Sequence, residues 1–314
     1  MGLYPEATSA GSAANGAIRR LIKAIGLVLL YGVAWLLVSL SLLPTANIIL
    51  GDVVESMDDA SEMAYEGVFM ILAVAIVNLI ILCGFKSRAA AAGWPNLRLG
   101  VTGFGNGALI GLGMSGGMFV LTLLMSGGEF SVDGNPWTDY LMRVIPLLLF
   151  VLVSTLGEEW LFRGYPLTVL ANATNAGWAN LLMALLFSLM HATAAGFNGL
   201  VAFNIVIGSL VVGALRFTRG GIPTAWGFHF AWNGMQVVAG SNLTGLNLQV
   251  PVLHYTAKGS VWLSGGALGP EGGIGAALST LIVLGCMVVY FRRRGIAVLP
   301  VPFGRRNPET VPQA

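Results

Sequence analysis

Charged residues are scarce in this chain. Asp, Glu, Lys and Arg make up 10% of its 314 residues, whereas they make up about a quarter of an ordinary soluble domain. The chain is 56% hydrophobic, and its mean hydropathy is +0.79. The sequence therefore predicts an integral membrane protein. A net charge of only +2 supplies no strongly basic surface, so we expect no nucleic-acid partner.

Cysteines and metal-binding motifs are also few. The two cysteines, Cys83 and Cys286, lie in apolar runs, and they form neither a CxxC pair nor a disulfide framework. The zinc-protease motif HExxH is missing. We therefore expect no cofactor, although other arrangements of Glu and His can hold zinc.

The alternation of apolar and polar residues that marks the strands of a membrane barrel is lacking as well. Long continuous apolar runs are present instead, and a helix satisfies every backbone group of such a run inside lipid. The sequence predicts an all-α, polytopic transmembrane helical bundle. We expect about eight spans, near residues 25–50, 68–84, 107–125, 140–162, 178–195, 198–217, 222–238 and 274–290.

The distribution of Lys and Arg predicts the orientation of the bundle. Eight spans place both termini on one side of the membrane, and cytoplasmic segments carry an excess of basic residues. Of the 16 basic residues, only Arg143 and Lys258 fall on the side opposite the termini. We therefore predict that both termini are cytoplasmic.

The third predicted span contains two patterns of small residues, Gly107/Gly111 and Gly113/Gly117. Such a spacing lets two helix backbones approach closely. It can serve dimerisation or packing within one chain, and we favour packing within the chain.

Two adjacent carboxylates end the fourth apolar run. Ionisable residues inside a span are costly, and they indicate a functional site by default. Residues four apart share one face of a helix, so Glu159 can pair with Arg163. Glu158 lies about 100° further round the helix and is left free. The alternative is that both glutamates are interfacial charges at the end of a span.

Two more polar pairs at a spacing of four residues follow. Phe187 precedes His191, and His229 precedes Asn233. Taken singly, His191 could be a packing histidine, and the other pair could make a polar contact between helices. The third histidine, His254, lies in a loop and is assigned neither a partner nor a role.

Taken together, these residue types suit a hydrolase without a covalent nucleophile. A Glu and a His can hold and deprotonate a water molecule. A His and an Asn can donate hydrogen bonds to the oxyanion that forms when this water attacks an amide. Glu with two His is also a ligand set for zinc. A transporter that relays protons through Glu and His is a further alternative, but no inverted repeat supports it.

Three motifs resemble the signature of the CAAX protease and bacteriocin-processing family (CPBP, the abortive-infection family): Glu158-Glu159-x-x-x-Arg163, Phe187-x-x-x-His191 and His229-x-x-x-Asn233. They occur in the family's order on three predicted helices. The resemblance implies a helical bundle of intramembrane glutamic endopeptidases, whose eukaryotic members trim prenylated CAAX proteins. It says little about the first three spans and the eighth.

Carried over residue by residue, the resemblance implies four catalytic roles. Glu158 would be the general base, and His191 would hold the attacking water. His229 and Asn233 would form the oxyanion hole. This mechanism needs no metal, but a zinc-dependent membrane protease that uses the same residues stays an alternative.

Three further residues would support these four. Glu159 and Arg163 would orient Glu158 and contact the substrate, and Phe187 would pack beside His191. The expected partners are the lipid bilayer and a membrane-bound or lipidated protein or peptide. A non-catalytic immunity or partner-binding membrane protein that kept the site residues is the alternative from another class.

The predicted organisation has five parts. They are a disordered cytoplasmic N-terminus (1–24), transmembrane helices 1 to 3 (25–139), a CPBP-like catalytic core of helices 4 to 7 (140–240), an extracytoplasmic loop (241–273), and helix 8 with a basic cytoplasmic tail (274–314). A short interfacial helix is expected at 166–173. Short loops, Gly- and Ala-rich spans and the absence of targeting signals suggest a multi-pass protein of a bacterial inner (cell) membrane.

Overall fold

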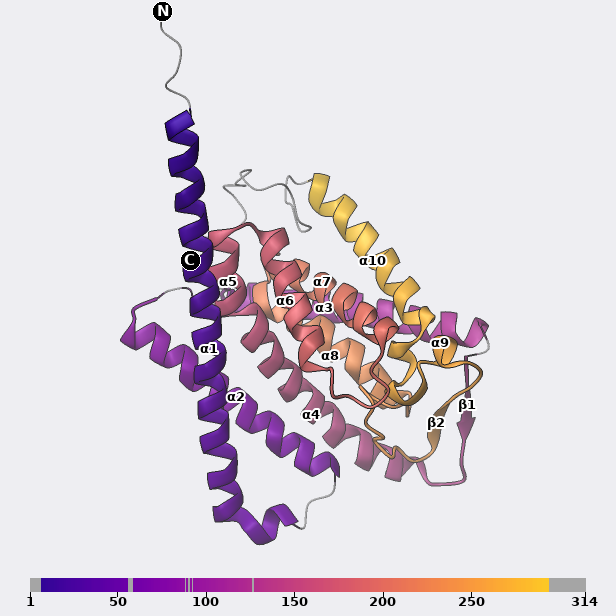
Figure 1. Cartoon of the computed structure of the whole chain (residues 1–314). Coiled ribbons are helices and arrows are strands. Elements are labelled where there is room, and N and C mark those ends of the chain that lie inside the picture. Colours follow the sequence, from indigo (N-terminus) through magenta and orange to yellow (C-terminus); the bar gives the residue numbers. More distant parts are fainter. Residues whose placement is uncertain are drawn as a thin grey trace, which may run out of the picture.

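The structure, a computed structural model, describes residues 7–55, 59–87, 89, 91, 93–125 and 127–293. These residues form a helical bundle with one small two-stranded sheet at the end away from α1 (Figure 1). Helices close all their backbone hydrogen bonds within one segment, which is what apolar runs inside lipid require. The predicted all-α transmembrane fold class is therefore confirmed.

The helices follow the predicted spans. They are α1 (Ala7–Glu55), α2 (Asp59–Gly84), α3 (Leu97–Leu124), α4 (Trp137–Arg163), α5 (Tyr165–Ala173), α6 (Ala176–Met190), α7 (Gly199–Arg216), α8 (Gly221–Val238), α9 (Val261–Ser264) and α10 (Ile274–Arg293). Short 3-10 turns occupy Gly266–Leu268 and Pro270–Gly272. Each of the eight predicted spans overlaps one helix, and α5 matches the short helix expected in the connector.

Within the described residues, six segments are long and apolar enough to cross a membrane: 15–49, 65–84, 97–124, 137–173, 199–216 and 274–293. The protein is therefore a multi-pass integral membrane protein. Because α6 has only 15 residues, it rises about 22 Å, which is short of the roughly 30 Å of a bilayer core. The count of eight spans and the cytoplasmic termini stay predictions.

The N-terminal segment differs from the expectation of disorder in residues 1–24. Helix α1 begins at Ala7, so most of that segment is helical. Residues 7–24 are rich in alanine, which has the highest helix propensity of all residues. Residues 1–6 and the predicted basic tail from residue 294 onward lie outside the described part of the chain.

Helices α3 and α8 pack against each other more extensively than any other pair of elements. A Cβ atom at Gly107 would lie 2.0 Å from the Thr224 carbonyl oxygen, and one at Gly111 would lie 2.4 Å from the Phe228 carbonyl oxygen. The first small-residue pattern therefore packs within the chain, as we favoured. In the second pattern, a Cβ atom at Gly117 would lie 2.9 Å from Ser279 Oγ on α10, whereas one at Gly113 would have no atom of the described residues within 4 Å.

Replacing Gly107 with Ala is expected to destabilise the protein, because the added methyl group would collide with the backbone of α8. Overpacking of this kind costs about 1–3 kcal/mol or more. Thermal unfolding in detergent would show a lower Tm for Gly107→Ala. Gly113→Ala on the same helix is the matched control and should leave the Tm nearly unchanged. Equal melting of the two variants would contradict the packing.

The two-stranded sheet joins segments that are far apart in the sequence. Strand β1 (Gly128–Val132) pairs antiparallel with β2 (Leu253–Ala257), from Gly128 opposite Ala257 to Val132 opposite Leu253. An ion pair between Glu129 and Lys258 adds a contact beside the sheet. The sheet therefore fastens the loop that follows α8 to the loop between α3 and α4.

His254 has a partner, contrary to the expectation that it has none. Its Nε2 lies 2.7 Å from Oδ2 of Asp133, and the same Oδ2 accepts a hydrogen bond from Val252 N at 3.2 Å. The contact with His254 and further hydrogen bonds lower the pKa of Asp133 to about 2. Since the two residues are 121 positions apart, the sequence contained no local signal for this contact.

The low pKa of Asp133 predicts a pH dependence of the sheet. Because the pKa is below the ordinary 3.8, the carboxylate contributes its full stabilisation above about pH 4 and loses it as the pH falls through about 2. Asp133→Asn should therefore lower the hydrogen-exchange protection of the Val252 amide at neutral pH, with Asp139→Asn as the control. Unchanged protection at neutral pH would refute this role.

Candidate active site

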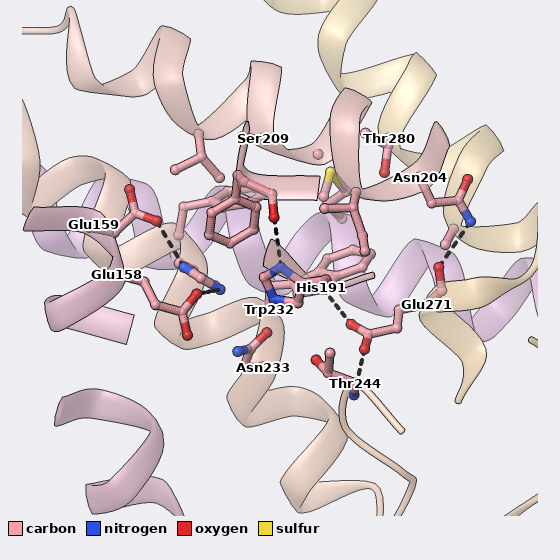
Figure 2. A pocket seen from close by; sticks show the side chains of 18 of the residues that line it. Glu158, Glu159, His191, Asn204, Ser209, Trp232, Asn233, Thr244, Glu271 and Thr280 are labelled. Atoms are coloured by element: carbon pink, nitrogen blue, oxygen red, sulfur yellow. Dashed lines mark hydrogen bonds and ion pairs between the residues drawn. The ribbon is translucent and has the colours of Figure 1, made fainter. Parts of the chain in front are cut away.

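A cavity of about 110 Å³ lies among α4, α6, α7, α8 and the segment that leads into α10 (Figure 2). Its wall holds polar side chains that are far apart in the sequence. All seven residues that the sequence singled out line this one cavity: Glu158, Glu159, Arg163, Phe187, His191, His229 and Asn233. The tertiary structure therefore brings the three motifs together.

The end of α4 holds a buried ion pair. Glu159 is fully buried and Arg163 is 1% exposed, and the guanidinium lies 3.3 Å from Oε1 of Glu159. A second guanidinium nitrogen, Nη2, donates to Ser209 Oγ on α7 at 2.5 Å. The pair predicted from the four-residue spacing is present, and it matters because an unpaired charge at this depth would be strongly destabilising.

Glu159 also contacts the third motif. Its Oε1 accepts a hydrogen bond from His229 Nδ1 at 2.8 Å. The resemblance implies that Glu159 orients Glu158, which stays a prediction; the contact seen here is with the His229 ring. A carboxylate on one ring nitrogen determines which way the other nitrogen faces, and here His229 Nε2 faces Glu158.

Glu158 is the free carboxylate of the pair. It is 26% exposed, and its Oε2 lies 3.9 Å from His229 Nε2, which is too long for a hydrogen bond. Within the described residues, this Oε2 has no hydrogen-bond partner. Glu158 can therefore accept a hydrogen bond or a proton from a molecule that enters the cavity.

His191 lies at the C-terminal end of α6, not inside a span that runs to residue 195. The His191 side chain occupies the carbonyl that would continue the helix, because its Nδ1 donates to the Phe187 carbonyl at 2.8 Å. The backbone N–H of His191 donates instead to the Ser188 carbonyl at 3.1 Å, and the helix ends there. A carbonyl oxygen only accepts hydrogen bonds, so Nδ1 carries a hydrogen. In a neutral ring, Nε2 then keeps a free lone pair.

Phe187 packs at the centre of these groups. Its ring centroid lies 4.6 Å from that of His191 and 6.0 Å from that of His229. The guanidinium carbon of Arg163 lies 4.5 Å from the same centroid, a cation–π distance. The phenyl ring thus keeps the histidines of α6 and α8 in place beside the buried ion pair.

The comparisons with known proteins cover this part of the chain. Residues 140–235 match the family model of the type II CAAX prenyl endopeptidases, Rce1-like. We call residues 140–235, which resemble this family, the CAAX protease segment. No curated protein matched the chain. The CAAX protease segment contains all seven site residues, and because the family consists of proteases, the match suggests a CAAX-type intramembrane protease.

The cavity has residues that sequence reasoning missed. Glu271 and Asn204 line it as well, and Glu271 lies beyond the CAAX protease segment, in the loop before α10. The Glu271 carboxylate accepts hydrogen bonds from Thr244 N at 2.6 Å and from Trp232 Nε1 at 3.3 Å. In the sequence, Glu271 stands out only as the single acidic residue of a Gly-rich loop, and this did not indicate that it lines the cavity.

The side chains of the CAAX protease segment can be compared with the ligands that a catalytic zinc ion requires. Catalytic zinc sites use three His, Glu, Asp or Cys ligands. In the part of the chain that the structure describes, no group of three or more such side chains is arranged to hold a metal ion. The zinc alternative stays a prediction, and we derive no step through a metal.

Proposed function

We propose that this protein is an intramembrane glutamic endopeptidase that hydrolyses a peptide bond of a membrane-associated protein or peptide. The observation that supports it best is the free Glu158 carboxylate, which faces His229 across 3.9 Å on the wall of the shared cavity. Members of the matched family act on membrane-associated prenylated proteins, so a membrane-bound or lipidated substrate is the substrate class that we propose here.

In the first step, a water molecule would be held between Glu158 and His191. The lone pair on His191 Nε2 accepts one hydrogen bond from the water, because Nδ1 already donates to Phe187. Glu158 takes the other proton as general base, and the resulting hydroxide attacks the carbonyl carbon of the substrate. A positioned base of this kind contributes about 10²- to 10⁴-fold to the rate.

The negative charge on the attacked oxygen would be stabilised by His229 and Asn233, which lie one helical turn apart on α8. His229 Nδ1 donates to Glu159, so a donor at Nε2 requires the imidazolium form. The C–N bond then breaks, and the proton on Glu158 passes to the leaving nitrogen. Preorganised donors of this kind typically contribute about 10²- to 10³-fold each.

Cleavage of quenched peptides by the purified protein in detergent tests this function. The set should include prenylated and unprenylated peptides, each incubated with and without a metal chelator. We expect cleavage that is insensitive to chelator and absent from Glu158→Ala. Cleavage retained by Glu158→Ala would overturn the proposal. Cleavage lost with chelator and restored by zinc would replace it by the metal mechanism, and no cleavage of any peptide would favour a non-catalytic protein.

A further inference from the structure

The cavity has a second carboxylate site, away from Glu158. In Figure 2, Glu158 and Glu159 lie on one side of the cavity, Glu271 and Asn204 lie on the other, and Trp232 and His191 lie between them. Glu271 belongs to the loop before α10, and its side chain reaches toward Trp232, whose indole donates to it. The proposed mechanism does not use this end of the cavity.

Among the described residues, the groups that donate to the Glu271 carboxylate are neutral. Oε1 accepts from Thr244 N at 2.6 Å, and Oε2 accepts from Trp232 Nε1 at 3.3 Å and Gln236 Nε2 at 3.0 Å. A carboxylate has about four acceptor positions, so one remains open, on Oε1. Among the described residues, no Lys, Arg or His forms an ion pair with Glu271. Its charge therefore faces the cavity without a counter-charge.

Two buried amide oxygens beside Glu271 lack donors as well. Asn204 Nδ2 donates to the carbonyls of Glu271 and Gly273, each at 2.9 Å, so its Oδ1 must be the remaining acceptor. Asn204 is 7% exposed and lines the cavity, and no described residue donates to that Oδ1. Gln236 Oε1, on a fully buried side chain, likewise has no donor.

On the cavity wall, Glu271 and Asn204 therefore supply a negative charge and an acceptor without a described donor. A buried acceptor without a donor is costly, and such groups are uncommon in native structures. The chemical complement is a group that carries several donors and a positive charge. A protonated amine has three donors and no acceptor, and a guanidinium has five. Hydrogen bonds between such groups and a carboxylate are among the strongest in proteins.

We propose that Glu271 and Asn204 form a subsite that binds a protonated amine or guanidinium of the substrate. The group would come from a Lys or Arg side chain, or from the free amino terminus of a peptide. The subsite rests on the proposed function, because it selects among substrates of the same cavity. Glu271 is thus a specificity-determining residue that lies outside the segment shared with the CAAX protease family.

The spacing along α8 places the subsite relative to the scissile bond. Trp232 and Gln236, which both donate to Glu271, lie three and seven residues after His229. At 1.5 Å per residue, these are about 4.5 and 10.5 Å along the helix axis. An extended peptide covers about 3.3 Å per residue. The cationic group should therefore lie within about three residues of the bond that is cleaved.

A lysine scan tests the subsite. N-acetylated quenched peptides would carry a single Lys at each position in turn, and matched peptides would carry Gln there. A third set without Lys would have a free amino terminus, which separates the two sources of the cation. We expect at least about a tenfold preference in kcat/KM for Lys at one position, or for the free terminus, the size of one charge-assisted hydrogen bond.

The preference should disappear in Glu271→Gln and persist in Glu129→Gln, a control carboxylate on β1. A merely structural role for Glu271 would lower kcat/KM equally for the Lys and Gln peptides, and an unchanged ratio would overturn the subsite. Fluorescence anisotropy with the Glu158→Ala variant measures the ratio of binding affinities for the Lys and Gln peptides without cleavage. If the proposed function is wrong, the Glu158→Ala variant will still cleave peptides, whatever its preference between Lys and Gln peptides.

Discussion

Replacing Glu158 with Gln is expected to lower kcat by about 10²- to 10⁴-fold, the usual contribution of a general base. Gln keeps the size and the hydrogen-bonding capacity of the side chain but cannot accept the proton from water. KM should change little, since the shape of the cavity is kept. Steady-state kinetics on the best peptide from the cleavage assay would measure both constants.

The control for Glu158 lies on the same helix. Asp139 is exposed in the first turn of α4, and Asp139→Asn should leave kcat unchanged. Wild-type kcat in Glu158→Gln would exclude Glu158 as the base. The His229 ring, oriented by Glu159 across 2.8 Å, would then be the next group to examine, because a histidine oriented by a carboxylate is a common arrangement of a general base.

Replacing Arg163 with Met is expected to lower the free energy of unfolding by about 3–5 kcal/mol, the usual cost of breaking a buried ion pair. Arg163 is 1% exposed, and it neutralises the fully buried Glu159. Met keeps much of the apolar length of the side chain but leaves that carboxylate without its arginine partner. Activity should be lost too, because Glu159 also orients His229. Thermal unfolding in detergent would show a large fall in Tm.

A double variant shows whether the loss of stability in Arg163→Met comes from the unpaired charge of Glu159 or from lost packing of the Arg163 side chain. The double variant Glu159→Gln/Arg163→Met removes both charges and should recover much of the stability, since replacing a whole buried pair is far less costly than breaking one. It should stay inactive. Arg219→Met, at an exposed arginine beyond α7, is the control for loss of an arginine. An unchanged Tm in Arg163→Met would contradict the role of the pair.

The sequence by itself determined the features that depend on composition and on short spacing. Scarce charge and long apolar runs predict membrane helices, because lipid offers no partners to backbone groups. A spacing of four residues places two side chains on one helix face, so the Glu159–Arg163 pair could be predicted. The same spacing placed Phe187 beside His191. The order of the three motifs indicated the family, and the match over residues 140–235 agrees with it.

Only the tertiary structure decided which helices meet and which side chains face one another. Glu159 and His229 are 70 residues apart, and their contact depends on the packing of α4 against α8. The hydrogen bond that holds the His229 ring crosses between these two helices and does not depend on local propensity. The position of Glu271 depends on how the last loop folds over α8. Contacts between distant residues follow from the packing of whole elements, and for this reason local sequence patterns could not predict them.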